Sequence, residues 1–249
     1  MWADAISSTT RQSSTHGHAG ADHNLYGGVF GVEFNAGTRG AAGLAIGHTW
    51  DRVNTFGMSR VKQDSQHAGA FGRAKLTASG AHSLWLEASA SYGKTDSRGT
   101  LGASRERWSQ DSCTLNVHAN DVWQLDEETA VNFFGGLEYV ATDSGHIDDL
   151  RTGSVQNLRG EIGAGVTRTI GRGMVFAEAS LTGDMVRHNP QADLGTRRGG
   201  ANPGRIGGSI SVGGAYILNA HWSVNATYTF EGVKHNNSHN ASVGATFRF

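Results

Sequence analysis

Apolar and polar residues alternate with a period of two through most of this 249-residue chain. Between Trp222 and Glu231, one parity reads Trp, Val, Ala, Tyr and Phe, while the other reads Ser, Asn, Thr, Thr and Glu. The pattern recurs in the segments 83–92, 113–120, 131–139, 157–166, 175–182, 206–216 and 241–249. Successive side chains of a strand point to opposite faces of its sheet, so the pattern predicts strands with one apolar face. Weaker segments at 2–8, 26–34, 41–51 and 68–76 bring the total to about twelve strands of roughly 9–11 residues.

The residues on the second parity decide what kind of sheet this is. Soluble β-sandwiches and propellers also alternate, but their interiors are filled with large side chains. Here the polar parity is rich in Gly, Ser, Thr and Asn, which suits a water-filled interior. The chain has 36 Gly and only 2 Pro, and Pro is scarce in sheets because it removes a hydrogen-bond donor. A membrane strand needs an apolar residue only at every second position, so the modest 37% of hydrophobic residues is compatible with a membrane barrel.

The links between these segments alternate between short and long. The short links are 35–40, 77–81, 125–128, 171–173 and 218–221. The long links are 11–24, 52–64, 94–107, 142–155, 187–204 and 232–240. Outer-membrane barrels have short periplasmic turns and longer extracellular loops. We therefore predict an all-β fold: a single antiparallel up-and-down transmembrane β-barrel with both termini on the periplasmic side.

Aromatic residues near the segment ends support the same fold. Those at the short-link end are Trp222, Tyr216 and Phe247, and those at the long-link end are Tyr92, Tyr139, Tyr228 and Trp50. Tyr and Trp gather at the two membrane interfaces of such barrels. The two groups therefore predict two aromatic girdles around the barrel.

The last segment carries a recognisable signature. Ser242, Gly244, Phe247 and the terminal Phe249 follow the order polar residue, Gly, hydrophobic residue, terminal aromatic. This order is similar to the assembly signal of outer-membrane barrels. Together with the runs 213–216 and 222–226 and the opening 2–5 and 26–31, it resembles the C-terminal β-domain of autotransporters, the type V secretion proteins.

The resemblance extends over nearly the whole chain and implies a function. Residues 1–249 would form one translocator barrel in the bacterial outer membrane, which anchors an N-terminal passenger and helps to move it to the cell surface. It implies three partners: outer-membrane lipid, the barrel-assembly machinery and a covalently linked passenger. It implies no cofactor. The first residues have neither a basic region nor an apolar core, so we expect the signal peptide and the passenger to be absent from this chain.

Charged residues on the polar parity are the candidate site. These lumen-lining charges are Glu33, Glu87, Glu138, Arg159, Glu161, Glu178, Asp184 and Arg248. One interpretation is that they line the pore and pair with a linker helix, as the resemblance implies. The other is that they pair with one another and simply fill the lumen. Both interpretations stay open at this stage.

Other functions have weaker support. A net charge of −1 provides no basic excess for nucleic-acid binding. His16, His18 and His23 have a spacing compatible with a metal site but stand in a polar loop without a fourth ligand, so we expect no metal. An outer-membrane protease could use Asp184 with His188, but no nucleophile motif accompanies them, and we expect no enzyme. A passive pore or an adhesin barrel without a passenger is the remaining alternative.

Overall fold

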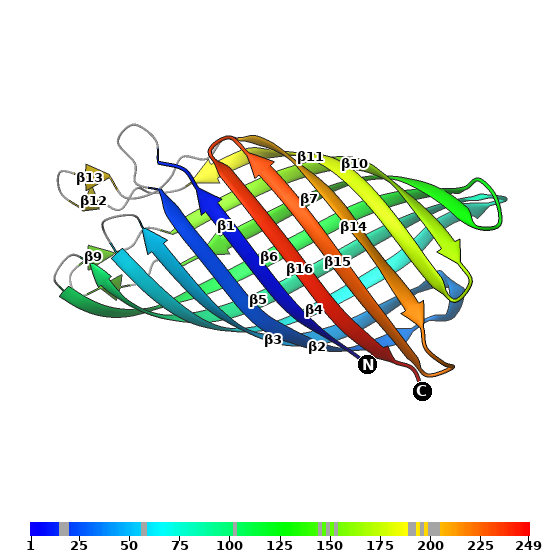
Figure 1. Ribbon diagram of the computed structural model, residues 1–249, viewed down its shortest axis with the longest axis horizontal. Helices are drawn as coiled ribbons and strands as arrows, with labels where there is room; N and C mark the ends of the chain where they lie inside the picture. The colour runs from blue at the N-terminus through cyan, green and yellow to red at the C-terminus, as the bar shows by residue number, and fades with distance from the viewer. Residues whose placement is uncertain are drawn as a thin grey trace.

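Twelve strands close into one antiparallel barrel in the computed structural model (Figure 1). It describes residues 1–14, 20–55, 59–101, 104–143, 146–147, 150–151, 154–188, 193–194, 197–198 and 205–249. The barrel strands are β1 (Trp2–Gln12), β2 (Ala21–Asn35), β3 (Gly40–Thr55), β4 (Ser59–Ser79), β5 (His82–Leu101), β6 (Ser104–Gln124), β7 (Thr129–Thr142), β10 (Val155–Ile170), β11 (Gly173–His188), β14 (Ile206–Ile217), β15 (Trp222–Val233) and β16 (Asn236–Phe247). The predicted twelve-stranded barrel is therefore confirmed.

Three small elements lie in the links. Two two-stranded hairpins, β8 (His146–Ile147) with β9 (Leu150–Arg151) and β12 (Asp193–Leu194) with β13 (Arg197–Arg198), stand between barrel strands. A 3-10 turn, η1 (Gly37–Arg39), joins β2 to β3. No helix among the described residues is long and apolar enough to cross a membrane.

The alternation in the sequence corresponds to the two faces of the barrel wall. On β15, Val224, Ala226 and Tyr228 are exposed on the outer wall, while Asn225 and Thr227 are half-buried on the lumen side. Ile162 and Leu181 on other strands are 66% and 62% exposed. In the described part of the chain no large side chain is fully buried. The apolar surface therefore faces outward, as a lipid-facing wall requires.

The strands are longer than predicted, and some predicted loops are wrong. The barrel strands contain 11 to 21 residues, and most of the predicted links 52–64 and 94–107 belong to strands. Between β15 and β16 the link is only Lys234 and His235, the latter in the left-handed region at φ 68°. In these extensions both faces carry polar residues, because both meet water beyond the bilayer. Alternation then no longer marks a strand, and the predicted contrast between short and long links fails there.

The predicted short turns are present, and the one after β6 shows how such a turn is held. The carboxylate of Asp126 accepts hydrogen bonds from the backbone N–H groups of Glu128 and Thr129, both at 2.8 Å. These two bonds hold the pKa of Asp126 below its usual value. The turn between β10 and β11 instead uses Gly171 at φ 58°, a conformation that favours glycine.

The barrel closes where β1 pairs with β16, from Trp2 opposite Thr246 to Gln12 opposite Asn236. At the end of this seam the Met1 amino group donates to the carbonyl oxygen of Phe247 at 2.9 Å. Both termini lie at the end of the barrel that carries the short turns (Figure 1). Closure leaves no open strand edge, which lipid could not satisfy.

Candidate functional site in the barrel lumen

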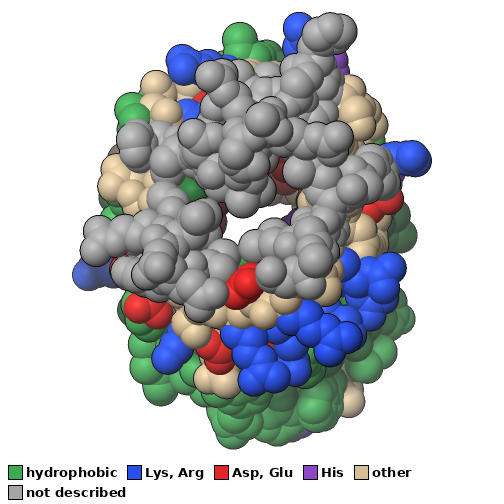
Figure 2. Space-filling view, turned by 90° about the vertical axis from the view of Figure 1, so that its left-hand side faces the viewer, with side chains coloured by type: hydrophobic (Ala, Val, Ile, Leu, Met, Phe, Trp, Pro, Cys, Tyr) green, Lys and Arg blue, Asp and Glu red, His purple; other side chains and the backbone are tan. Residues whose placement is uncertain are grey.

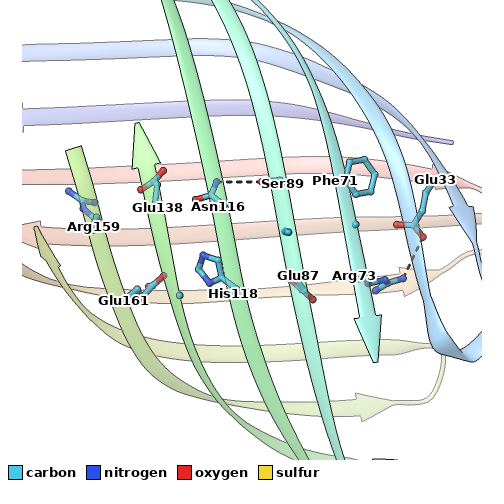
Figure 3. Close-up of a pocket in the computed structure, with 13 residues that line it drawn as sticks. Glu33, Phe71, Arg73, Glu87, Ser89, Asn116, His118, Glu138, Arg159 and Glu161 are labelled. Atoms are coloured by element: carbon cyan, nitrogen blue, oxygen red, sulfur yellow. Dashed lines mark hydrogen bonds and ion pairs between the residues drawn. The ribbon is translucent and has the colours of Figure 1, made fainter. Parts of the chain in front are cut away.

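The lumen contains two neighbouring cavities lined largely by polar side chains. The larger has a volume of about 530 Å³, and its polar lining includes Glu33, Arg73, Glu87, Ser89, Asn116, His118, Glu138, Arg159 and Glu161 (Figure 3). The smaller, of about 260 Å³, is lined by Asn120, Asn132, Phe134, Glu178 and several serines. Glu87, His118 and Glu161 line both cavities, so the two cavities adjoin.

Aromatic side chains face the lumen on several strands, and glycines on neighbouring strands make room for their rings. A Cβ atom on the glycine would clash with the ring in each of four pairs: Gly31 with Trp2, Gly43 with Phe71, Gly163 with Phe134, and Gly213 with Phe176. The Trp2 and Phe71 rings also meet edge to face, with centroids 6.0 Å apart. Glycine on the lumen parity therefore has a packing role, because the rings lie flat against the wall only where no side chain intervenes.

Two arginines hold part of the lumen charge in ion pairs. Arg73 on β4 lies 3.4 Å from Glu33 on β2. Arg159 on β10 bridges Asp184 at 3.2 Å and Glu231 at 2.8 Å. Asp184, only 2% exposed, also contacts Arg187. A carboxylate as buried as Asp184 is stable only when paired in this way.

Other lumen carboxylates remain without such partners. Among the described residues, Glu87, Glu138 and Glu161 form no ion pair with any side chain. Glu138 stands directly opposite Arg159 in the sheet, but Arg159 pairs with Asp184 and Glu231 instead. All three glutamates line the larger cavity (Figure 3). The cavity is therefore acidic and can hold cations or a basic segment of polypeptide.

The predicted lumen charges occupy four kinds of place. Five of them line the larger cavity: Glu33, Glu87, Glu138, Arg159 and Glu161. Glu178 lines the smaller cavity, where it accepts a hydrogen bond from Asn132. Asp184 lies beside Arg159. Arg248 lies beyond the last residue of β16, is exposed, and lines neither cavity.

The residues of the predicted assembly signal lie along the closing strand. Ser242 and Gly244 face the lumen, and a Cβ on Gly244 would meet the carboxylate of Asp4 on β1. Phe247 packs beside Trp222, with ring centroids 5.1 Å apart. Phe249 is 90% exposed at the short-turn end of the barrel. Their role in assembly stays a prediction.

Some lumen residues were missed by the sequence analysis. Arg73 and Phe71 share the lumen parity of β4, a segment whose alternation is weak because small residues fill the other parity. Phe71 and Arg73 stand two residues apart, and this spacing was the signal that could have placed both on the lumen side. Arg187 faces inward although Met185 and Val186 are both exposed, because a bulge opposite Leu158 and Arg159 shifts the register. No parity rule predicts that position.

The candidate metal and protease residues can be placed only in part. His23 pairs with Asp51. His16 and His18 lie outside the described residues, as does the side chain of His188. In the part of the chain that is described, no cluster of three metal-ligating side chains occurs.

A comparison with protein families identifies the fold more closely. Residues 1–229 match the model of the family described as autotransporter beta-domain. The chain belongs to this family. A comparison with curated proteins found no match.

Three solved autotransporter domains share the fold. The transport unit of AIDA-I from Escherichia coli has a TM-score of 0.80 at 16% identity, with 100% of this chain and 90% of that one covered. The translocator domain of NalP from Neisseria meningitidis has a TM-score of 0.74 at 16% identity, with 100% and 87% covered. The β-domain of the Bordetella autotransporter BrkA has a TM-score of 0.73 at 14% identity, with 100% and 98% covered.

Membership in this family gives the barrel its location and its task. It is an outer-membrane β-barrel of type V secretion, which anchors a passenger and helps to move it to the cell surface. It acts as a transport domain. In this autotransporter barrel, the lumen is the part of the molecule that a translocating chain would meet.

Proposed function

We propose that the lumen of this autotransporter barrel receives a segment of the polypeptide that precedes β1, and that basic side chains of that segment pair with Glu87, Glu138 and Glu161. The observation that carries the proposal is that three of the carboxylates lining the lumen cavity, those of Glu87, Glu138 and Glu161, have no ion-pair partner among the described residues. Like charges that line one cavity disfavour one another, and opposite charges nearby favour the ionised carboxylates. A segment with Lys or Arg would supply the missing partners.

The position of the N-terminus is compatible with this route. Met1 lies at the short-turn end, so a preceding chain enters the lumen from that side. There it would meet the rings of Trp2 and Phe71, which contact each other, and Phe71 already lines the acidic cavity. An α-helix is about 10–12 Å wide with its side chains. Barrels of about eight strands are filled by their own side chains, while those of 16 to 18 leave an aqueous channel, so twelve strands leave intermediate room.

The lumen charge gives the first test. The barrel alone should conduct ions in a planar bilayer and should favour cations, because the unpaired carboxylates attract them. Glu87 and Glu161 line both cavities. The double variant Glu87→Gln with Glu161→Gln should reduce the cation preference, measured as the reversal potential across a KCl gradient. Glu128→Gln, at an exposed short turn, is the matched control and should leave selectivity unchanged. Unchanged selectivity in the double variant would show that these acids do not face the conducting path.

The second test concerns the preceding segment. The barrel extended by its natural upstream sequence should conduct less than the barrel alone, because the segment occupies the lumen. In the extended protein, the Glu87→Lys and Glu161→Lys double variant should restore part of the conductance by repelling the basic segment. If the extended protein conducts as well as the barrel alone, the lumen does not hold the segment, and a passive pore becomes the better description.

Assembly and catalysis are further parts of the proposal. The barrel-assembly machinery would recognise Ser242, Gly244, Phe247 and Phe249 on the closing strand, and outer-membrane lipid would cover the apolar outer wall. We also propose that the barrel catalyses no reaction. Support for this comes from Asp184, the candidate protease acid, which is nearly buried and bound by Arg159 and Arg187. A carboxylate held in this way is poorly placed to activate water.

A further inference from the structure

The outer wall of β2 to β6 changes from apolar to cationic toward the loop end, as rows of directly opposed residues show. One row, named here the apolar row, consists of Phe30, Ile46, Ala68, Tyr92 and Cys113. Four residues further toward the loop end stands a row of Tyr26, Trp50, Asp64, Asp96 and Ser109. The next outward-facing row contains four cations, named here the cation row: Arg52, Lys62, Arg98 and Arg107. Figure 2 shows Lys and Arg side chains gathered on one side of this end of the barrel, next to the apolar wall.

Four like charges on four adjacent strands are unfavourable unless something neutralises them. Directly opposite residues of antiparallel strands have Cβ atoms about 4.5–5.5 Å apart, and like charges at that spacing destabilise the pairing. All four side chains of the cation row are exposed. Within the described parts of the chain, none of them forms an ion pair. The four cations are therefore available to an anion from outside the protein.

Nearby carboxylates only partly offset this charge. Asp64 lies 2.8 Å from His48, and Asp96 accepts a hydrogen bond from Ser109. Arg60 and Arg105, in the row beyond the cation row, add two further cations, while Asp22 in that row lies 3.8 Å from Arg11 on β1. The surface formed by the row of Tyr26, the cation row and the row beyond it thus keeps a clear positive excess.

The surface is also hollowed. A groove of about 450 Å³ is lined by Tyr26, Trp50, Arg52, Lys62 and Arg98, together with neighbouring polar residues. A second groove of about 580 Å³ continues past Asp64 and Asp96 to Arg107. Both grooves lie along the cation row, so a ligand with several anionic groups could contact successive cations.

The tilt of the strands determines how high the cation row stands above the bilayer. Tyr26, Trp50 and Tyr92 are 57%, 54% and 55% exposed, as expected of interfacial aromatic residues. On β3, Arg52 follows Trp50 by two residues, which is about 5 Å of height at a rise of about 3.3 Å and a tilt of about 40°. On β5, Arg98 follows Tyr92 by six residues, or about 15 Å on the same basis. The row therefore begins at headgroup level and climbs away from the membrane.

We propose that the cation row binds a phosphorylated glycolipid of the outer leaflet, with Arg52 and Lys62 on phosphates at headgroup level and Arg98 and Arg107 on anionic groups of the sugar part above. An ordinary anionic phospholipid carries its phosphate only at headgroup level and would reach only the lower half of the row. Arginine suits such ligands because its planar guanidinium binds phosphate through two parallel hydrogen bonds. The assignment does not depend on the lumen or on the passenger.

Lipid binding by the whole barrel tests the proposal. The purified barrel in uncharged detergent is titrated with lipopolysaccharide as the phosphorylated glycolipid, with phosphatidylglycerol as the anionic phospholipid, and with inorganic phosphate. The test variant replaces the cation row, as Arg52→Gln, Lys62→Gln, Arg98→Gln and Arg107→Gln. The control variant removes four cations at the short-turn end, as Arg39→Gln, Arg168→Gln, Arg172→Gln and Arg248→Gln. Heat-modifiable gel mobility verifies that both variants fold, and removal of the like charges should leave the test variant at least as stable as the wild type.

The expected results separate the lipid classes. A basic residue near an anionic surface contributes about fivefold in affinity, so the test variant should bind lipopolysaccharide at least tenfold more weakly than the wild type, while the control variant binds it unchanged. Phosphatidylglycerol should bind more weakly than lipopolysaccharide and should lose less in the test variant. Equal lipopolysaccharide affinity in the wild type and the test variant, or an equal loss in the control variant, would overturn the site. Phosphatidylglycerol binding as tight as that of lipopolysaccharide, or full displacement of lipopolysaccharide by inorganic phosphate, would overturn the glycolipid assignment.

Discussion

The facing of β15 can be tested by placing the same charge on adjacent residues. Ala226 is exposed on the outer wall and Thr227 faces the lumen. Ala226 stands four residues from Trp222 and two from Tyr228, or about 10 Å and 5 Å of height at a rise of about 3.3 Å and a tilt of about 40°. An arginine facing lipid costs about 2–4 kcal/mol at the midplane and about 0–1 kcal/mol near the interfaces. Ala226 lies between the midplane and an interface. We therefore expect Ala226→Arg to cost about 2 kcal/mol.

The matched change Thr227→Arg should cost little, because its guanidinium can reach the water and acids of the lumen. A difference of about 2 kcal/mol corresponds to about a 30-fold change in the ratio of folded to unfolded protein. Reversible urea unfolding in phospholipid vesicles, followed by tryptophan fluorescence, measures this difference. Ala226→Leu is the control for size and should unfold like the wild type. Equal losses from the two arginines, or a greater loss from Thr227→Arg, would refute the assigned register, since a slip of one residue exchanges the two faces.

Three further predictions concern assembly, packing and a turn. Deletion of Phe249, or Phe247→Asp, should reduce insertion into the outer membrane more than a loop substitution does, as measured by heat-modifiable mobility and surface protease accessibility; normal insertion would remove the assembly role. Gly163→Val should lower the urea midpoint, because its side chain would displace the ring of Phe134, and the double variant with Phe134→Ala should recover part of the loss; a neutral single variant would contradict the packing argument. Asp126→Ala should destabilise the turn after β6 at neutral pH. Because the pKa of this carboxyl is lowered in the folded protein, its contribution to stability should be present above the unfolded pKa and lost as pH falls through the folded pKa. A difference in stability between variant and wild type that persists in acid would contradict this.

The sequence by itself determined the fold class, because alternation reports the environment of each face directly. Wherever one face of a strand meets lipid and the other meets water, as from Trp222 to Glu231, every second residue must be apolar. The same rule placed Glu87, Glu138 and Glu161 on the lumen side before their surroundings were known. It could not set the ends of the strands, because beyond the bilayer both faces meet water and the pattern disappears.

Only the tertiary structure decided which charges pair and which stay open. Arg159 joins Asp184 and Glu231, although Glu138 is its direct neighbour across the sheet. That choice depends on the curvature of the closed wall and on the bulge that brings Arg187 beside Asp184. The cation row was likewise invisible in the sequence, where Arg52 and Arg107 stand far apart. Register aligns residues from four strands in one row, and parity within a single strand contains no information about register.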